Sequence, residues 1–243
     1  MVIKLVSATT PTLALCLVGT FCLLATACTV GPDDGEAPGS LTVFAAASLA
    51  DAFSELGLAF ELQNPRATVA FNFAGSQRLR TQLEHGAQAD IFASADWQQM
   101  KAIQALSLTS GEPSTFAANR LVIITPMGGL HENIISTNEL RIDTINAFGT
   151  DADKQVLHYL ATPGIKLVLA LEQVPVGDYS REVIRNIGAD PQFNASYAQK
   201  VLANVVSEET NVRDVVQKVA MGEADAGIVY LTNAMAPAVK ERT

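Results

Sequence analysis

The chain has 243 residues and a formal net charge of −9 at neutral pH; 49% of its residues are hydrophobic and 17% are charged. This composition excludes a disordered chain and suits one or two globular domains with a sizeable core. The acidic balance and the scattered Lys and Arg residues argue against nucleic-acid binding, because such a surface repels phosphate backbones.

The N-terminus has the pattern of a secretory signal peptide, which we assign to residues 1–27. Lys4, the only charged residue of this segment, is followed by an interrupted apolar run that ends at Leu24. The run is too short and too interrupted for a transmembrane helix. It continues into LATAC (24–28), which resembles a bacterial lipobox and predicts a lipid on Cys28. Ordinary signal-peptidase cleavage after Ala27, without a lipid, is the alternative.

The segment after the signal peptide predicts a flexible tether over residues 28–40. Residues 29–39 read TVGPDDGEAPG and have no hydrophobic periodicity. All three cysteines, at positions 16, 22 and 28, lie at or before the start of this tether. The domain that follows can therefore form neither an internal disulfide nor a thiolate metal site.

From Leu41 onward, short apolar runs alternate with helical patterns, which is typical of an α/β fold with a largely parallel sheet. In the first half the runs predict strands over 41–46, 68–73 and 90–93. Helical patterns follow each of them. The first helix would bury one face and end at Asn64-Pro65; the residues of that face are Leu49, Ala52, Phe53, Leu56 and Phe60. A second helix opens at Ser76 and stops at Gly86, and a third covers 97–106.

The second half predicts strands over 121–125, 165–170 and 226–230, with helices over 178–187 and 212–221. Residues 131–164 have weak patterning, so no element is assigned there. The grouping predicts two lobes, a first lobe over 41–120 and a second lobe over 121–236, followed by a tail over 237–243.

Four of the predicted strand-to-helix turns carry a hydroxyl residue or a small, open backbone segment. They are Ser48, Ser76, Val176-Gly177 and Asn211-Val212. Helix N-termini expose unpaired N–H groups and a partial positive charge, so several that converge would form an anion site without any cationic side chain. The alternative for each is an ordinary N-cap.

Five segments closely resemble the molybdate-binding subunit of bacterial ABC transporters. They are FAAASLADAF (44–53), FNFAGSQRLRTQLEHGAQADIFASAD (71–96), VPVGDYSREVI (174–184), TNVRDVV (210–216) and ADAGIVYLTNA (224–234). The resemblance implies a two-lobed, class II periplasmic-binding-protein-like fold, in which each lobe is a mostly parallel sheet flanked by helices. It also implies that a tetrahedral oxyanion is held between the lobes without counter-ions.

The resemblance also implies a set of ligand contacts. Ser48 and Ser76 would each offer a hydroxyl and a backbone N–H, Val176 and Val212 would offer backbone N–H groups, and Tyr230 would offer its hydroxyl. The alternatives are a strand-end aromatic for Tyr230 and core positions for the two valines. No catalytic residue, metal or cofactor is expected, with molybdate or tungstate as the transported ligand.

The implied function is that of a monomeric binding protein, outside the cytoplasm, that delivers molybdate to an ABC-transporter permease. It would be a membrane lipoprotein or a periplasmic protein. The alternatives are a binding protein for sulfate, phosphate or a small organic acid, a sensory domain, and an enzyme. The sequence shows no nucleophile elbow, and His85, His131 and His158 lack metal-ligand spacing.

The sequence departs from the family pattern in two places. Residues 169–173, LALEQ, stand before VPVG where relatives commonly have a Gly-Asp-Pro-like turn. The chain also stops 13 residues after Tyr230, where relatives continue with a strand and helices that return to the first lobe. We therefore expect the C-terminal part of the first lobe to be missing.

Overall fold

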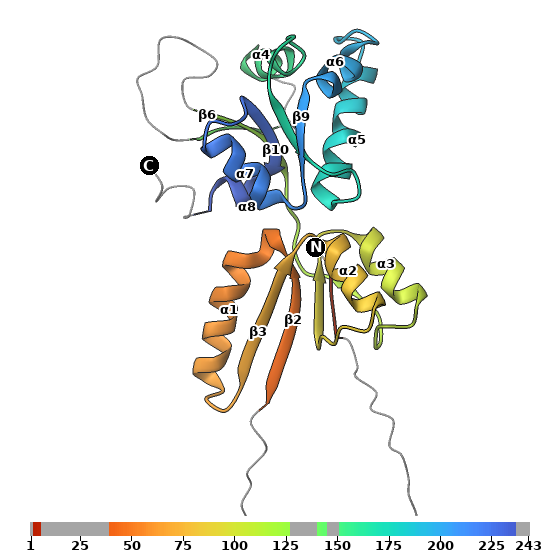
Figure 1. Cartoon of the computed structure of the whole chain (residues 1–243), viewed down its shortest axis with the longest axis vertical. Helices are drawn as coiled ribbons and strands as arrows, with labels where there is room; N and C mark the ends of the chain where they lie inside the picture. Colours follow the sequence, from red (N-terminus) through yellow and green to blue (C-terminus); the bar gives the residue numbers. More distant parts are fainter. Residues whose placement is uncertain (1, 6–38, 127–139, 145–150, 237–243) are drawn as a thin grey trace, which may run out of the picture.

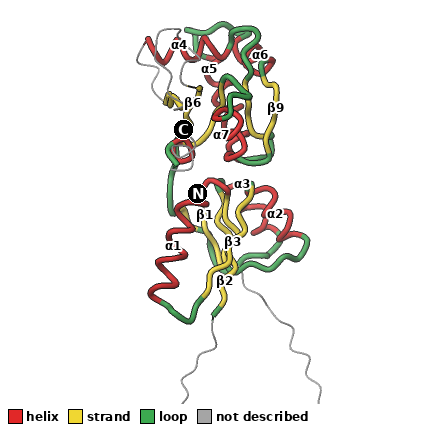
Figure 2. Tube along the Cα trace, turned by 60° about the vertical axis from the view of Figure 1, so that its left-hand side comes forward, coloured by secondary structure: helices red, strands yellow, loops and turns green. Residues whose placement is uncertain are grey.

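The computed structural model describes residues 2–5, 39–126, 140–144 and 151–236. These residues form two lobes, one above the other in Figure 1, and each lobe is built on a five-stranded sheet. Residues 116–120 run from the last strand of the first sheet to the first strand of the second, and Figure 2 shows this loop along one side of the molecule.

The first sheet has the strand order β3-β2-β4-β1-β5. Its strands are β1 (Val2–Leu5), β2 (Ser40–Ala46), β3 (Thr68–Ala74), β4 (Ile91–Ser94) and β5 (Ser114–Thr115). Strand β2 pairs in parallel with β3 and β4. Strand β1, which falls within the predicted signal peptide, pairs antiparallel with β4 and β5.

The helices of the first lobe cover both faces of this sheet. They are the short 3-10 helix η1 (Ala47–Leu49), α1 (Ala50–Gln63), α2 (Ser76–Glu84) and α3 (Trp97–Ala105). Successive residues of β2 point to opposite faces: Val43 packs with Phe53 of α1, and Phe44 packs with Leu79 of α2. In Figure 1, α1 lies on one side of the sheet and α2 and α3 on the other.

The predicted buried face of α1 is partly wrong. Leu49 and Phe53 are buried as expected, but Ala52 is exposed, and Leu56 and Phe60 are 61% and 41% exposed. The helix meets the sheet at Gly57 instead, where an added Cβ would come within 2.6 Å of the Phe71 ring. The glycine lets the aromatic ring of β3 approach the helix backbone, and this contact turns Leu56 and Phe60 toward solvent.

The second sheet has the strand order β7-β6-β10-β8-β9. Its strands are β6 (Leu121–Pro126), β7 (Leu140–Thr144), β8 (Leu167–Ala170), β9 (Val205–Glu209) and β10 (Ala226–Tyr230). Strand β10 is antiparallel to β6 and parallel to β8, and β8 is parallel to β9. This central parallel part is the pattern that the apolar runs predicted.

Helices cover both faces of the second sheet as well. They are α4 (Asp151–Leu160), α5 (Pro175–Ala189), α6 (Tyr197–Ala203), α7 (Val212–Ala220) and α8 (Leu231–Ala234). Helix α7 packs through Val215 and Val219 on one face, while α4, α5 and α6 pack around Leu169 and Ile228 on the other. Among the helices that the structure describes, none combines the length and hydropathy needed to cross a membrane.

The predicted elements correspond to strands β2, β3, β4, β6, β8 and β10 and to helices α1, α2, α3, α5 and α7. Helix α5 begins at Pro175 rather than at residue 178, because proline is well accommodated at the first helical position. The elements that were not predicted are strands β1, β5, β7 and β9 and helices η1, α4, α6 and α8.

Candidate functional site

A small cavity of ≈ 20 Å³, open in part to solvent, lies between the two lobes. Its walls come from the starts of four helices and the end of β10. The lining residues are Ala46, Ala47, Ser48, Gly75, Ser76 and Ala95 of the first lobe, and Val174, Pro175, Val176, Asn211, Val212 and Tyr230 of the second. All five residues that the sequence suggested as ligand contacts are therefore brought together here.

Ser48 lies within η1, directly after the buried end of β2. The N-cap position of this helix is occupied by Ala46, whose side chain makes no capping hydrogen bond. Ser48 lies inside the helix, so its N-cap interpretation is wrong. Its Oγ atom is buried and has no hydrogen-bond partner among the described residues. As a residue of the first turn, Ser48 also has no intrahelical acceptor for its N–H. Ser48 thus contributes two polar groups, its hydroxyl and its backbone N–H, to the wall of the cavity.

Ser76 is the first residue of α2, and Gly75 takes the N-cap position without a side-chain cap. The N-cap interpretation of Ser76 is therefore wrong too. The buried Ser76 Oγ accepts a hydrogen bond of 3.0 Å from the Ala95 N–H, which leaves the hydroxyl proton available to donate. At Gly75, an added Cβ would come within 2.6 Å of the Thr210 carbonyl oxygen of the other lobe. Only glycine permits this approach.

Asn211 caps α7 and leaves the backbone N–H of Val212 without an intrahelical acceptor. Its side-chain oxygen accepts hydrogen bonds from the N–H groups of Arg213 and Asp214, at 2.9 and 3.2 Å. The N-cap interpretation is therefore correct at Asn211. The N–H of Val212, the first residue of the helix, has no intrahelical acceptor. The cap thus satisfies the second and third N–H groups of α7 and leaves the first one at the cavity.

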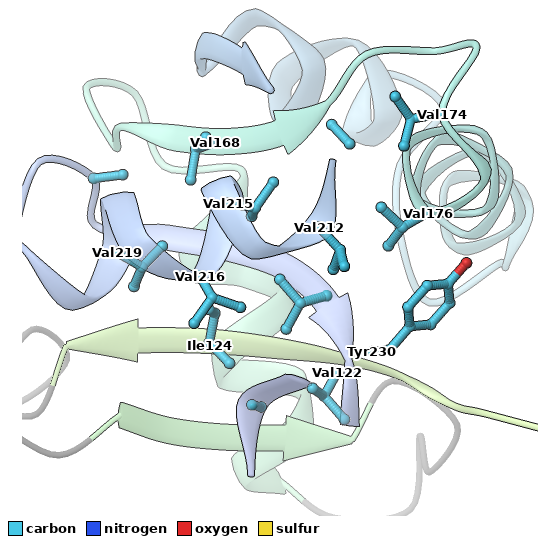
Figure 3. Close-up of a cluster of buried hydrophobic side chains, with 14 residues drawn as sticks. Val122, Ile124, Val168, Val174, Val176, Val212, Val215, Val216, Val219 and Tyr230 are labelled. Atoms are coloured by element: carbon cyan, nitrogen blue, oxygen red, sulfur yellow. The ribbon is translucent and has the colours of Figure 1, made fainter. Parts of the chain in front are cut away.

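Val176 and Val212 are core residues whose backbones also reach the cavity. Their side chains are 1% and 3% exposed and belong to a cluster of buried apolar residues. Figure 3 shows them together with Tyr230 at one end of this cluster. Val176 follows Pro175 at the start of α5, so its N–H likewise has no intrahelical acceptor. The core interpretation and the donor interpretation of these valines are therefore compatible.

The start of α5 is fixed against the end of β8. An added Cβ at Gly177 would lie 2.5 Å from the Ala170 carbonyl oxygen, so only glycine fits there. The buried Arg181 guanidinium donates to the carbonyl oxygens of Ala170 and Gly177, at 2.8 and 2.9 Å, and pairs with Glu208. These contacts hold the first turn of α5, and with it Val176, in one position.

Tyr230 ends β10 with its side chain 6% exposed. Its hydroxyl is buried and has no hydrogen-bond partner in the described part of the chain. Burial raises the pKa of Tyr230 well above its ordinary value, and nearby Tyr179 and Asp96 raise it further. The hydroxyl therefore keeps its proton at neutral pH and can act as a donor.

None of the lining residues carries a charge. Asp96, next to the lining residue Ala95, is buried at the N-cap of α3 and accepts from the Gln99 N–H at 2.9 Å. Burial raises the pKa of Asp96, and hydrogen bonds from Gln99 and Ser94 oppose that rise. Within the described ranges no three His, Cys, Asp or Glu side chains are grouped to hold a metal, and His131 lies outside those ranges. The cavity offers neutral donors and is chemically suited to an anion.

Apart from Asn211, the lining residues other than the five expected contacts were not singled out from the sequence. Most are small: Ala47 and Gly75 directly precede Ser48 and Ser76 in the AAAS and FAGS segments, and Ala95 follows Ser94 in the ASAD segment. Small residues beside a hydroxyl at a strand-to-helix turn are the available signal, because they allow a ligand to approach the backbone N–H groups closely.

The profile of the family described as bacterial extracellular solute-binding proteins matches residues 41–243. The molybdate-binding protein ModA of Mycobacterium tuberculosis is 38% identical over 210 residues, which cover 86% of this chain and 67% of the relative. The solved periplasmic molybdate-binding protein of Azotobacter vinelandii is similar with a TM-score of 0.58 at 20% identity, over 79% of this chain and 72% of that one. The solved sulfate-binding protein SubI of Mycobacterium tuberculosis is similar with a TM-score of 0.59 at 15% identity, over 84% of this chain and 68% of that one. The predicted two-lobed fold is confirmed.

Proposed function

The chain belongs to the family of bacterial extracellular solute-binding proteins, and from this premise we propose that it captures molybdate between its lobes and delivers it to an ABC-transporter permease. Tungstate is expected to bind at the same site, because it is a tetrahedral dianion of similar size. Molybdate is then the cargo, and we propose that the protein acts as a monomer with neither catalytic activity nor a resident cofactor.

One observation carries this proposal: two buried hydroxyls that have no hydrogen-bond partner among the described residues line the same cavity from opposite lobes. The Ser48 Oγ belongs to the first lobe and the Tyr230 hydroxyl to the second. A buried polar group without a partner is costly, by about 1–3 kcal/mol each. An oxyanion between the lobes would accept from both hydroxyls and from the free N–H groups at the helix starts.

The proposed donors can supply enough binding free energy. Ser48 and Ser76 offer a hydroxyl and an N–H each, Val176 and Val212 an N–H each, and Tyr230 its hydroxyl. Hydrogen bonds to a charged group contribute about 1.5–3 kcal/mol each. After association costs, a set of this size is compatible with micromolar or tighter binding, which corresponds to about −8 kcal/mol.

The uncharged lining favours an oxyanion that carries no proton. Hydrogenphosphate has its own O–H, which needs a strong acceptor, and none of the described residues that line the cavity carries a carboxylate. Sulfate, which is fully deprotonated like molybdate, is therefore the second candidate ahead of phosphate and small organic acids. Molybdate is the larger of the two dianions, so the size of the closed cavity decides between them.

We place the protein outside the cytoplasm, anchored by a lipid on Cys28. The support is the apolar run before Leu24 and the lipobox-like LATAC segment. Release of residues 1–27 would also remove β1, which contributes no residue to the cavity.

The deciding experiment is calorimetric titration of the purified protein with molybdate, tungstate, sulfate and phosphate. We expect one molybdate or tungstate to bind per chain, with sulfate weaker by at least about tenfold, or 1.4 kcal/mol. Sulfate binding of equal or greater strength would overturn the molybdate assignment while leaving the anion site in place. Failure of all four anions to bind would overturn the proposed function.

A further inference from the structure

Two polar contacts join the lobes beside the cavity. The Arg213 Nη1 atom lies 3.1 Å from both carboxylate oxygens of Asp51. The Gln77 side-chain amide donates to the Thr210 carbonyl oxygen at 3.1 Å. Each contact connects the first turn of a first-lobe helix to the start of α7 or the residues just before it.

We propose that the Arg213–Asp51 ion pair is a closing latch, which forms when the lobes meet around the oxyanion and slows the release of the ligand. The two residues are positioning residues, and the inference rests on the proposed function because it assumes that an oxyanion occupies the cavity. Neither residue lines the cavity itself.

The latch acts on the two helix starts that face each other across the site. Arg213 directly follows Val212, whose N–H is free, and Asp51 lies in the first turn of α1, three residues after Ser48. The capping bonds from Asn211 make the first turn of α7 rigid. The ion pair between Arg213 and Asp51 therefore sets the distance between the Val212 N–H and the polar groups of Ser48.

The same pair removes an electrostatic conflict. Asp51 places a carboxylate beside an anion site, where its charge would repel the ligand. Arg213 compensates that charge only when the lobes are closed, because the two side chains belong to different lobes. Closure thus couples two favourable events, which are the contact between the lobes and the neutralisation of Asp51.

The size of the effect is limited by solvent. The Arg213 and Asp51 side chains are 31% and 42% exposed. Ion pairs with this exposure are worth at most about 1 kcal/mol, which corresponds to a change of about fivefold in an equilibrium constant, and they weaken in salt. We expect the latch to alter the dissociation rate of the ligand rather than the fold of either lobe.

The test is a double-mutant cycle on the full chain with molybdate as the probe. Arg213→Gln should raise the Kd about fivefold, mainly through faster release of labelled molybdate into an excess of unlabelled molybdate. In the Asp51→Asn background the same change should alter the Kd by less than twofold. The coupling should shrink in 1 M NaCl, while the melting temperature of the ligand-free protein should stay the same.

The matched control is Arg80→Gln. Arg80 pairs with Glu84 at 3.2 Å inside α2, with similar exposure, but the pair does not cross between the lobes. This variant should bind and release molybdate like the wild type. An equal loss of affinity from Arg213→Gln in both backgrounds would show simple attraction of the anion by Arg213 and would overturn the latch. Unchanged affinity in Arg213→Gln would overturn it too, whereas a wild type that binds no oxyanion would overturn the proposed function.

Discussion

The hydroxyl of Ser76 is fixed by the backbone of Ala95, whose N–H donates to it at 3.0 Å. Ser48, the other serine of the cavity wall, has no such partner in the part of the chain that the structure describes. The family resemblance implies the same role for both residues, but the structure separates them: the Ser76 hydroxyl already accepts a hydrogen bond within its own lobe and can still donate, whereas the Ser48 hydroxyl has neither kind of partner among the described residues.

This difference predicts two distinct phenotypes for the alanine variants. Ser48→Ala and Ser76→Ala should each weaken molybdate binding by about 1–3 kcal/mol, because each removes a donor to a buried charge. Ser76→Ala should in addition lower the free energy of unfolding of the ligand-free protein by about 1 kcal/mol, because the Ala95 N–H loses its acceptor. Calorimetry and chemical denaturation measure the two quantities separately. Wild-type affinity in both variants would remove these serines from the site.

Val212→Pro should remove a single backbone donor and leave α7 intact. Proline is tolerated at the first position of a helix, and the extended backbone of Asn211, with φ −159° and ψ 169°, suits a residue that precedes proline. We expect molybdate binding to weaken by about 1.5–3 kcal/mol, with little change in the melting temperature of the free protein.

Val212→Ala is the matched control for that variant. It keeps the N–H but removes two methyl groups from a side chain that is 3% exposed, so it should lower stability and leave affinity nearly unchanged. If the proline variant binds molybdate as tightly as the wild type, the Val212 N–H is not a ligand contact.

Tyr230→Phe should weaken molybdate binding by about 1–3 kcal/mol, since it removes a buried donor. In the wild type, burial raises the Tyr230 pKa above its ordinary value of 10.0, so the hydroxyl remains a donor from pH 7 to pH 10. Affinity should be constant across that range. A decline in affinity between pH 7 and pH 9 would contradict the role of the protonated hydroxyl.

The same pKa shift has a consequence for stability. A folded-state pKa above the unfolded-state value favours the protonated tyrosine in the fold, so its contribution is complete below pH 10 and is lost as the pH rises further. Tyr197, whose hydroxyl donates to the Leu157 carbonyl oxygen at 3.0 Å, has a pKa raised by burial and contributes in the same direction. Denaturation of Tyr230→Phe above pH 10 should therefore show a smaller alkaline loss than that of the wild type.

Cys28→Ser should release the protein from the membrane fraction of producing cells, because the predicted lipid is attached through the Cys28 sulfur. Cell fractionation with an antibody against the folded lobes measures this. Cys22→Ser, within the predicted signal peptide, is the control and should leave the distribution unchanged. Retention of a processed Cys28→Ser protein in the membrane would show that Cys28 is not the anchor.

Local sequence predicted the parts of the site that local structure creates. Ser48, Ser76 and Val212 each stand where a buried strand or loop gives way to a helix, and that transition is visible within about ten residues. The face of α1 was not predictable in the same way, because its periodicity does not show that Gly57 rather than Leu56 meets Phe71. Short elements such as β9, whose residues alternate between half-buried and exposed, give too weak a pattern to assign.

The contacts between the lobes also could not be predicted from the sequence. Arg213 and Asp51 are separated by 162 positions, and nothing in either segment indicates that they meet. Their pairing depends on the position of one lobe against the other, which no run of residues encodes by itself. The sequence therefore indicated residues that line the cavity but not the contacts that join the two halves of its wall.

The uncharged cavity wall determines how ligand binding changes the net charge of the protein. Because the described residues that line the cavity include no lysine, arginine or histidine, a bound dianion would be neither matched by a cationic side chain nor accompanied by a proton. The full formal charge of the ligand is then added to a chain that already carries −9. Loaded and empty molecules should consequently separate on an anion-exchange column and focus at different isoelectric points, so that occupancy could be read directly from a charge-based separation.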